Sequence, residues 1–312
     1  MKKIHQIEIK DQHLQGSISR NYEPILAVNS GDTVQFTAID IGWGYSSQQG
    51  EEREIFQSRE RENFWGHPVL GPIYVNGARP GDVLEVKIDQ LTPGWYGWNT
   101  AGGKFNWQNE QLELTKKEAR LDWLLNREKM TGSSSIGEWG FEVSLKPFLG
   151  FLAVSPSEEG VFSTVPPNYW GGNIDCKELT EGSTLYLPVS ADGALFTAGD
   201  GHARQGDGEI SGQAIECPMD DVYLTLNIVR DMELRLPASS TSEGWLTFGF
   251  HEDLNTAAAS AMNSMVDYIS NKFTINRAEA AALASATVDL RITQVVNGVK
   301  GVHAVLPFDA VK

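Results

Sequence analysis

The chain has 312 residues, a formal net charge of −16 at pH 7 and two cysteines, and 41% of its residues are hydrophobic. This composition is typical of a globular protein, and the length predicts one elaborate unit or two closely packed parts. The acidic charge disfavours nucleic acid and anionic membranes as partners, because no basic run is longer than Lys2-Lys3 or Lys116-Lys117.

Targeting and redox signals favour a cytoplasmic protein. No stretch of about eighteen apolar residues is present, so no membrane-spanning helix is predicted. The positively charged start is not followed by the apolar run of a signal peptide. Cys176 and Cys217 are too few for a disulfide framework, although one disulfide between them stays open as an alternative.

Strand and turn patterns dominate the first part of the chain. Ser30–Asp40 is a Gly-Asp turn followed by alternating apolar residues, and Pro80–Asp89 repeats this shape. Glu181–Val189 is a looser third copy. Such similar strand starts indicate either a jelly-roll-like β-sandwich or a barrel.

A segment rich in Gly, Pro and Trp follows at about residues 92–170. We predict a helix from Thr115 to Arg127, because this stretch begins with good helix formers. Aromatic residues such as Trp95 and Trp98 either line a ligand cleft or fill the core.

The last part of the chain has a different pattern of apolar residues. Asn255–Lys272 carries apolar residues at helical spacing, and a capping box at Asn276 and Glu279 opens a second helix. Val288–Val296 and Gly301–Pro307 then return to a strand pattern. The predicted fold is therefore mainly β with an α/β portion formed largely by the C-terminal region.

These patterns suggest a division into two parts without a flexible linker. Residues 1–250 form a β-rich sandwich or barrel that contains the Trp-rich insertion, and residues 251–312 form an α/β portion packed on it.

The strongest functional signal is the acidic, glycine-rich segment Asp200–Glu216. It contains the pairs Asp200/His202 and Asp207/Glu209, and residues two apart in an extended chain point to the same side. Each pair could therefore bind one ion or one substrate, while the glycines let the backbone approach it.

Other polar residues lie among glycines elsewhere. Asn173 and Asp175 supply an amide and a carboxylate two residues apart, His67 precedes a proline, and Asp40 ends the first alternating strand. Divalent ions accept such mixed ligands, although no HExxH or paired CxxC motif is present. For His67, a loop histidine without a ligand role is the alternative.

Glu216 is a candidate general base. If Glu209–Glu216 is one regular strand, Glu216 shares a face with apolar residues, and its carboxylate needs a partner or a raised pKa. Cys217 is the alternative nucleophile, but a single cysteine is more often a buried apolar residue. A nucleophile elbow and a phosphate-binding loop are both absent from the sequence.

Taken in order, these segments resemble the acetamidase/formamidase family over nearly the whole chain, with Trp95–Gly140 matching least. The segments that carry the resemblance are Gly66–Asp82, Gly171–Asp175, Leu185–Val189, Gly193–Phe196, Gly199–Glu209, Ala214–Glu216, Asp289–Asn297 and Lys300–His303. The resemblance implies hydrolysis of the C–N bond of a small amide, a β-sandwich joined to α/β elements, a homo-oligomer, and a metal in some members. The family name covers formamide, acetamide and cyclic-amide hydrolases.

Our hypothesis is that a divalent ion activates the water that attacks the amide. Zinc is favoured, with calcium as the alternative. The expected metal ligands are drawn from Asp40, His67, Asp200 and His202. The expected catalytic carboxylates are Glu216, Glu209 and Asp207, and the expected substrate-binding residues are Asn173 and Asp175. The competing hypothesis is a Ca²⁺-dependent carbohydrate-binding β-sandwich without catalysis.

Overall fold

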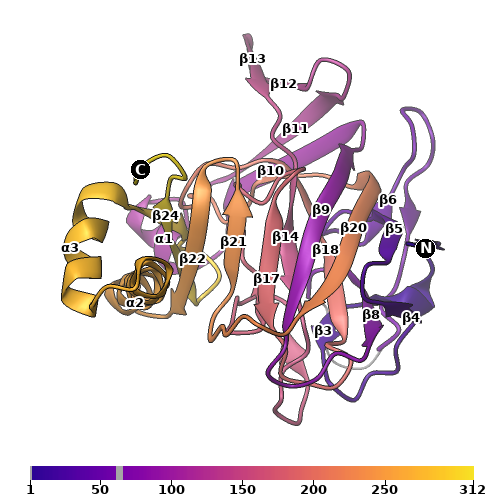
Figure 1. Cartoon of the computed structure of the whole chain (residues 1–312). Helices are drawn as coiled ribbons and strands as arrows, with labels where there is room; N and C mark the ends of the chain where they lie inside the picture. The colour runs from indigo at the N-terminus through magenta and orange to yellow at the C-terminus, as the bar shows by residue number, and fades with distance from the viewer. Residues whose placement is uncertain (1, 61–65) are drawn as a thin grey trace.

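The computed structural model describes residues 2–60 and 66–312, and most of this chain forms β-strands (Figure 1). The first large sheet contains, in spatial order, β1 (Ile4–Ile7), β5 (Thr33–Ala38), β20 (Met219–Val229), β9 (Val83–Pro93), β17 (Thr184–Pro188), β21 (Ala238–Thr241), β22 (Gly244–His251), β24 (Lys300–Leu306) and β23 (Asp289–Gln294). All but one of its neighbouring strands are antiparallel, since β1 pairs with β5 in parallel.

The second large sheet carries the acidic segment. Its order is β13 (Trp139–Ser144), β12 (Thr131–Ile136), β11 (Glu118–Asn126), β10 (Tyr96–Gly102), β19 (Ile215–Glu216), β18 (Phe196–Arg204), β14 (Phe148–Ala153) and β16 (Gly171–Asn173). Off this path, β8 (Val69–Asn76) pairs with β18 and also with β2 (Leu14–Gln15) and β4 (Leu26–Asn29). Two small ribbons join β3 (Ser17–Ile18) to β15 (Phe162–Ser163) and β6 (Gly44–Tyr45) to β7 (Glu54–Ile55).

A hydrophobic core lies between the two sheets. Val34 and Phe36 of β5 and Leu224 of β20 share one buried cluster with Phe151 of β14 and Phe196 of β18. The predicted alternation in the first strand is confirmed, because every second residue of β5 is buried. Burying one face of each sheet against the other gives the predicted β-sandwich.

The C-terminal helices cover one end of the first sheet, beside β22 and β24 (Figure 1). Helices α2 (Leu254–Phe273) and α3 (Arg277–Thr287) confirm the two predicted helices, and the capping box at Asn276 and Glu279 is present. A second apolar cluster, which includes Met265 of α2, packs them on the sheet. Because β23 and β24 are strands of the first sheet, the α/β portion is continuous with the sandwich.

The predicted helix from Thr115 to Arg127 is wrong. Most of this stretch forms β11, which pairs with β10 and β12. Trp123 and Leu125 are buried, and their neighbours along the strand are exposed or partly exposed. This period of two matches a half-buried strand, so pairing with β10 overrides the local helix propensity.

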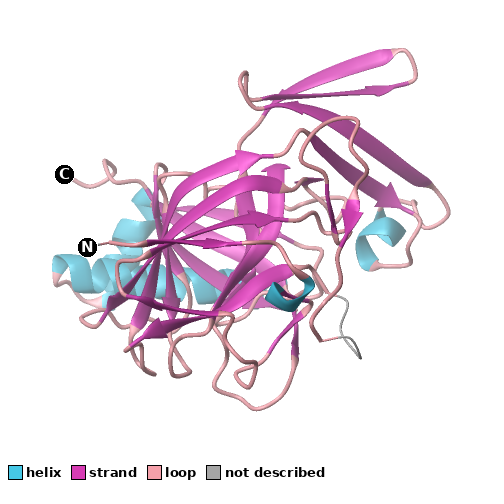
Figure 2. Cartoon of the chain, turned by 90° about the vertical axis from the view of Figure 1, so that its right-hand side faces the viewer, coloured by secondary structure: helices cyan, strands magenta, loops and turns pink. Residues whose placement is uncertain are grey.

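Strands β11, β12 and β13 project from the body as an arm (Figures 1 and 2). The remaining helices are α1 (Trp107–Gln111), close to this arm in sequence, and a 3-10 turn at Asp11–His13. Within the described residues no helix is long and apolar enough to cross a membrane. Cys176 and Cys217 are free and buried, so the alternative of a disulfide between them is wrong. The division at residue 250 stays a prediction.

Candidate active site

Strand β18 holds the first two residues of the site. Asp200 and His202 lie two positions apart on it, and both are buried. The Nε2 atom of His202 is 3.3 Å from Oδ1 of Asp200, which confirms that the two side chains point to the same side. The strand runs between β14 and β19, so neighbouring strands cover both of its edges here.

Glu216 reaches the same imidazole from β19. It pairs directly opposite His202, and its Oε2 is 3.2 Å from Nε2 of His202. Its other oxygen, Oε1, accepts a hydrogen bond of 3.1 Å from the backbone N–H of Ala214. The imidazole Nε2 therefore lies against two carboxylates, one from each strand.

Asp175 completes a group of three possible metal ligands. One ligand atom each from Asp175, Asp200 and His202 lie within 4.8 Å of one another. Asp175 follows β16 with a left-handed backbone (φ 54°), and its Oδ2 accepts a hydrogen bond of 2.6 Å from Asn297. Its other oxygen, Oδ1, has no hydrogen-bond partner among the described residues.

Gly150 of β14 provides the space in front of this group. A Cβ atom built on Gly150 would lie 2.5 Å from Oδ2 of Asp200, 2.7 Å from Oδ1 of Asp175 and 2.8 Å from Cε1 of His202. Three polar side chains thus converge on the position that a side chain would fill. Glycine leaves that position open to a bound ion or substrate.

Several buried polar atoms at the site lack a hydrogen-bond partner within the described part of the chain. They are Oδ1 of Asn173, Asp175 and Asp200, Nδ1 of His202, and Oε2 of Glu209 and Glu216. Leaving such atoms unpaired costs about 1–3 kcal/mol each. A cation and a polar substrate would satisfy them, and oxygen and imidazole nitrogen donors suit a hard or borderline divalent ion.

Burial and the charges of neighbouring groups shift the pKa values of the titratable side chains at the site. Burial raises the pKa of Asp175 to about 7, and burial also raises the pKa of Glu216 and of Glu209. Burial alone would lower the pKa of His202, but the carboxylates of Glu216 and Asp200 outweigh it and raise this pKa well above its ordinary value. Strong shifts within one buried cluster are typical of functional sites.

Glu209 reaches the site from a turn. The segment Glu209–Glu216 is not one regular strand, because Glu209 (φ 48°) and Gly212 (φ 87°) are left-handed and only its last two residues form β19. Glu209 is nevertheless buried, and besides burial the charge of Asp175 helps to raise its pKa, so it belongs to the same electrostatic cluster. The glycine-rich turn therefore brings a further carboxyl to the cluster.

Two predicted site residues are engaged elsewhere. Oδ2 of Asp40 accepts hydrogen bonds of 2.9 Å from Nε of Arg53 and 2.7 Å from the hydroxyl of Tyr96. Asp207 forms an ion pair of 2.7 Å with Lys177 near the surface. Asp207 is therefore paired with Lys177, whereas Glu209 is buried with the cluster, and binding of one ligand by both stays a prediction.

His67 and Asn173 stay close to the cluster. His67 is partly exposed, and its Nδ1 lies 3.3 Å from the carbonyl oxygen of Thr164. Burial alone would raise the pKa of Asp200, but the charge of His202 and, after it, that of His67 lower this pKa. Asn173 is buried at the end of β16, two residues before Asp175. Both remain candidates for contact with a substrate.

Sequence reasoning missed Gly150, Asn297 and Gln205. The side-chain amide of Gln205 donates a hydrogen bond of 2.8 Å to the backbone carbonyl of Asp175 and so helps to position that residue. Gly150 did carry a signal, since a lone glycine inside an apolar strand often marks a close approach. Asn297 lies on a loop after β23, and no local pattern predicted its contact with Asp175.

The aromatic residues of the Trp-rich segment were expected either to line a ligand cleft or to fill the core, and the structure shows residues of both kinds. Trp95 and Trp123, with Tyr96 and Arg53, line a cavity of about 710 Å³ between the sandwich and the arm. Trp170, in contrast, is buried in the main core. Some tryptophans of the segment therefore line the cavity, and others pack in the core.

The family model described as "Acetamidase/Formamidase family" matches residues 6–162 and 158–311. The chain belongs to the acetamidase/formamidase family. The residues of the buried cluster all lie within the matched ranges.

Individual members of the acetamidase/formamidase family agree with this assignment. An acetamidase of Mycolicibacterium smegmatis is 52% identical over 46% of this chain and 49% of its own length. A formamidase of Methylophilus methylotrophus is 47% identical over 68% of this chain and 64% of its own length. The chain thus spans about half to two thirds of these curated relatives.

The fold is also shared with a solved member of the family. The crystal structure of an acetamidase from Bacillus halodurans superposes with a TM-score of 0.81 at 28% identity, covering 96% of this chain and 97% of the other. The sandwich with its C-terminal portion is therefore also the architecture of this acetamidase.

Proposed function

We propose that the chain hydrolyses the C–N bond of a small linear amide of the formamide or acetamide type, releasing ammonia and a carboxylate. The main support is the convergence of Asp175, Asp200 and His202 on the open position at Gly150. The names of the curated relatives, an acetamidase and a formamidase, support the same reaction class. Because the converging side chains are at most 2% exposed, only a small molecule fits the proposal.

A divalent ion would be held by Asp175, Asp200 and His202, with Glu216 facing the same imidazole nitrogen. When bound, such an ion supplies polarisation of the amide carbonyl and acidification of a water molecule. Zinc accepts imidazole together with carboxylates, whereas calcium prefers an all-oxygen set of six to eight ligands. The donor set therefore favours zinc.

Glu209 is assigned the proton transfer. Its Oε2 has no hydrogen-bond partner among the residues described, so it is free to take a proton from the attacking water and deliver it to the leaving nitrogen. Oε1 of Glu216 accepts a hydrogen bond from the Ala214 N–H, and its Oε2, which also has no hydrogen-bond partner among the described residues, lies 3.2 Å from Nε2 of His202. Glu216 therefore positions the imidazole, and the base role expected for it passes to Glu209.

Asn173 and His67 are assigned to the substrate. The buried Oδ1 of Asn173 lacks a partner in the described structure and can accept a hydrogen bond from the amide N–H₂ group. His67, which is partly exposed, is assigned to the other end of the substrate. Binding by both ends would fix the carbonyl carbon for attack.

We also propose a homo-oligomer, a dimer or higher, in the cytoplasm. The arm exposes large apolar side chains, with Trp139 74% exposed, Leu124 50% and Phe141 45%. An exposed apolar group of this kind is typical of contacts between subunits. Light scattering coupled to size-exclusion chromatography tests the oligomer, and a monomer at micromolar concentration would contradict it. The two free cysteines agree with a reducing compartment.

Ammonia release from formamide, acetamide and a five-membered lactam tests the activity, with and without a strong chelator. We expect turnover of the linear amides that the chelator removes and that added Zn²⁺ restores. If only the lactam were hydrolysed, the proposed substrate class would be a cyclic amide and not a linear one. No ammonia from any of the three, together with Ca²⁺-dependent binding to a glycan array, would favour the carbohydrate-binding alternative.

A further inference from the structure

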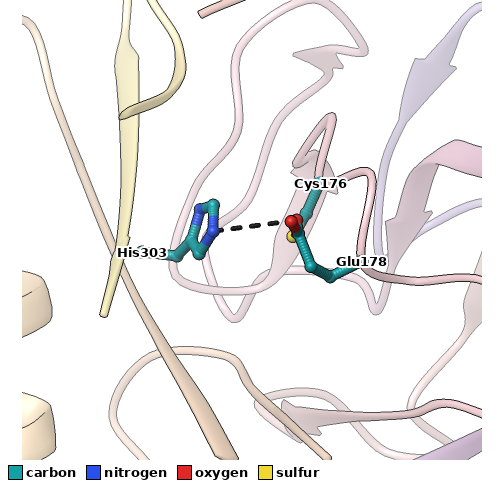
Figure 3. Close-up of side chains that lie close together, drawn as sticks. All are labelled: Cys176, Glu178 and His303. Atoms are coloured by element: carbon teal, nitrogen blue, oxygen red, sulfur yellow. Dashed lines mark hydrogen bonds and ion pairs between the residues drawn. The ribbon is translucent and has the colours of Figure 1, made fainter. Parts of the chain in front are cut away.

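A second cluster of metal-ligating side chains lies apart from the site described above. It consists of Cys176 and Glu178 on the loop after β16 and His303 on β24 (Figure 3). One ligand atom from each of the three lies within 4.8 Å of the other two. All three side chains are at most 2% exposed, so they face one another and not solvent.

The carboxylate of Glu178 is oriented toward the other two residues. Its Oε1 lies 3.3 Å from Nη1 of Arg291. Its Oε2 is 3.3 Å from Sγ of Cys176 and 3.7 Å from Nε2 of His303. One oxygen is thus held by the guanidinium group, and the other faces a sulfur and a nitrogen donor.

The imidazole of His303 is also fixed in orientation. Its Nδ1 forms a hydrogen bond of 2.8 Å with Oγ1 of Thr293 on the neighbouring strand β23. Its Nε2 is buried and has no hydrogen-bond partner among the described residues. A partner on one ring nitrogen that leaves the other free is the usual arrangement around histidine ligands of metal ions.

We propose that Cys176, Glu178 and His303 bind one zinc ion or a similar borderline transition metal. Binding releases the thiol proton to solvent, so the thiolate and the carboxylate together balance the two positive charges of the ion. Sulfur, nitrogen and oxygen are all zinc ligands, and the fourth tetrahedral position is left to water. The thiolate excludes calcium and magnesium, which prefer oxygen.

The ion would connect two distant parts of the chain next to the first site. Cys176 directly follows Asp175, one of the three residues that converge on Gly150. His303 belongs to β24, one of the strands on which α2 packs. An ion held by both would fix the loop that positions Asp175 to the C-terminal strands. Without an ion, the same residues form a network in which the thiol donates to Glu178.

Cobalt substitution separates this site from the first one. The protein is produced in zinc-depleted medium with Co²⁺, and its absorption and metal content are measured. A thiolate bound to Co²⁺ gives a charge-transfer band in the near ultraviolet, whereas Asp175, Asp200 and His202 offer only oxygen and nitrogen. We expect the band in the wild type. Its presence does not depend on amidase activity, so failure of the proposed function and failure of this proposal are distinguishable.

The two cysteines provide matched variants. We expect Cys176→Ser to lose the band and to bind one ion fewer per chain, while Cys217→Ser keeps both. Both thiols are fully buried, but Cys217 is not part of the cluster. Absence of the band from the wild type would overturn the proposal, and so would its loss in Cys217→Ser. If Cys176→Ser fails to fold, His303→Gln, with a weakened or shifted band expected, takes its place; an unchanged band there would also overturn it.

Discussion

His202 and Glu216 lie directly opposite each other on the antiparallel strands β18 and β19, with 3.2 Å between Nε2 and Oε2. The ladder between these strands shifts register just after His202. Two residues from the ends of one short segment are thus held face to face by sheet pairing in a fully buried place. This relationship supports the proposal that Glu216 positions the imidazole and that Glu209 transfers the proton.

Replacing Glu209 by Gln should lower kcat by about 10²–10⁴-fold and leave KM and metal content nearly unchanged, because only the proton carrier is lost. Steady-state ammonia release and elemental analysis measure these quantities. Asp207→Asn is the matched control, since Asp207 is paired with Lys177 near the surface. Equal losses in both variants would contradict the assignment.

Glu216→Gln should instead weaken metal binding by about 10–100-fold, the usual effect of removing a group that orients a ligand. The amide of Gln retains the size of the side chain and an acceptor for the Ala214 N–H. Competition with a fluorescent chelator measures the affinity, and excess Zn²⁺ should recover most of the activity. Normal metal affinity with a large loss of kcat would return the base role to Glu216.

A methyl group at Gly150 should fill the centre of the site. Gly150→Ala places a Cβ within 3 Å of three polar side chains, so we expect a loss of activity on the order of 10²-fold or more. Overpacking should also reduce stability by about 1–3 kcal/mol. Gly140→Ala on the arm has nothing within 4 Å of its Cβ and serves as the control. Wild-type turnover in Gly150→Ala would show that the reaction takes place elsewhere.

Asp40→Asn should reduce stability without reducing metal content. The buried carboxylate of Asp40 holds Arg53 and Tyr96, and because the arginine is 36% exposed and screened by solvent, we expect a loss of about 1–3 kcal/mol, which is below the cost of breaking a fully buried ion pair. Denaturant unfolding and elemental analysis distinguish this role from the ligand role expected from sequence. Loss of bound metal from folded Asp40→Asn would restore Asp40 to the ligand set.

Asp32 should contribute to acid sensitivity. A hydrogen bond from His5, followed by backbone hydrogen bonds, keeps the pKa of Asp32 below its ordinary value despite burial. The stabilisation is therefore complete above the unfolded pKa of about 4 and is lost as the pH falls through the lowered folded value. The midpoint of urea unfolding should fall less steeply below about pH 4 in Asp32→Asn than in the wild type. Identical slopes would show that other groups dominate.

Local patterns predicted the elements whose signals are local. The capping box at Asn276 and Glu279, the periodicity of α2 and the alternation of β5 each depend on residues a few positions apart. The stretch Thr115–Arg127 was predicted wrongly, because its helix-forming residues are outweighed by pairing with β10, which is set by a distant part of the chain.

The sequence by itself determined the fold class, the family and the concentration of ligand-type residues around Asp200 and His202. Only the tertiary structure decided which of them meet. It brought Asp175 and Gly150 into the cluster, tied Asp40 to Arg53, and placed Cys176 beside His303. The reason is physical: residue types and short spacings record which ligands are available, whereas convergence depends on strand register and left-handed turns.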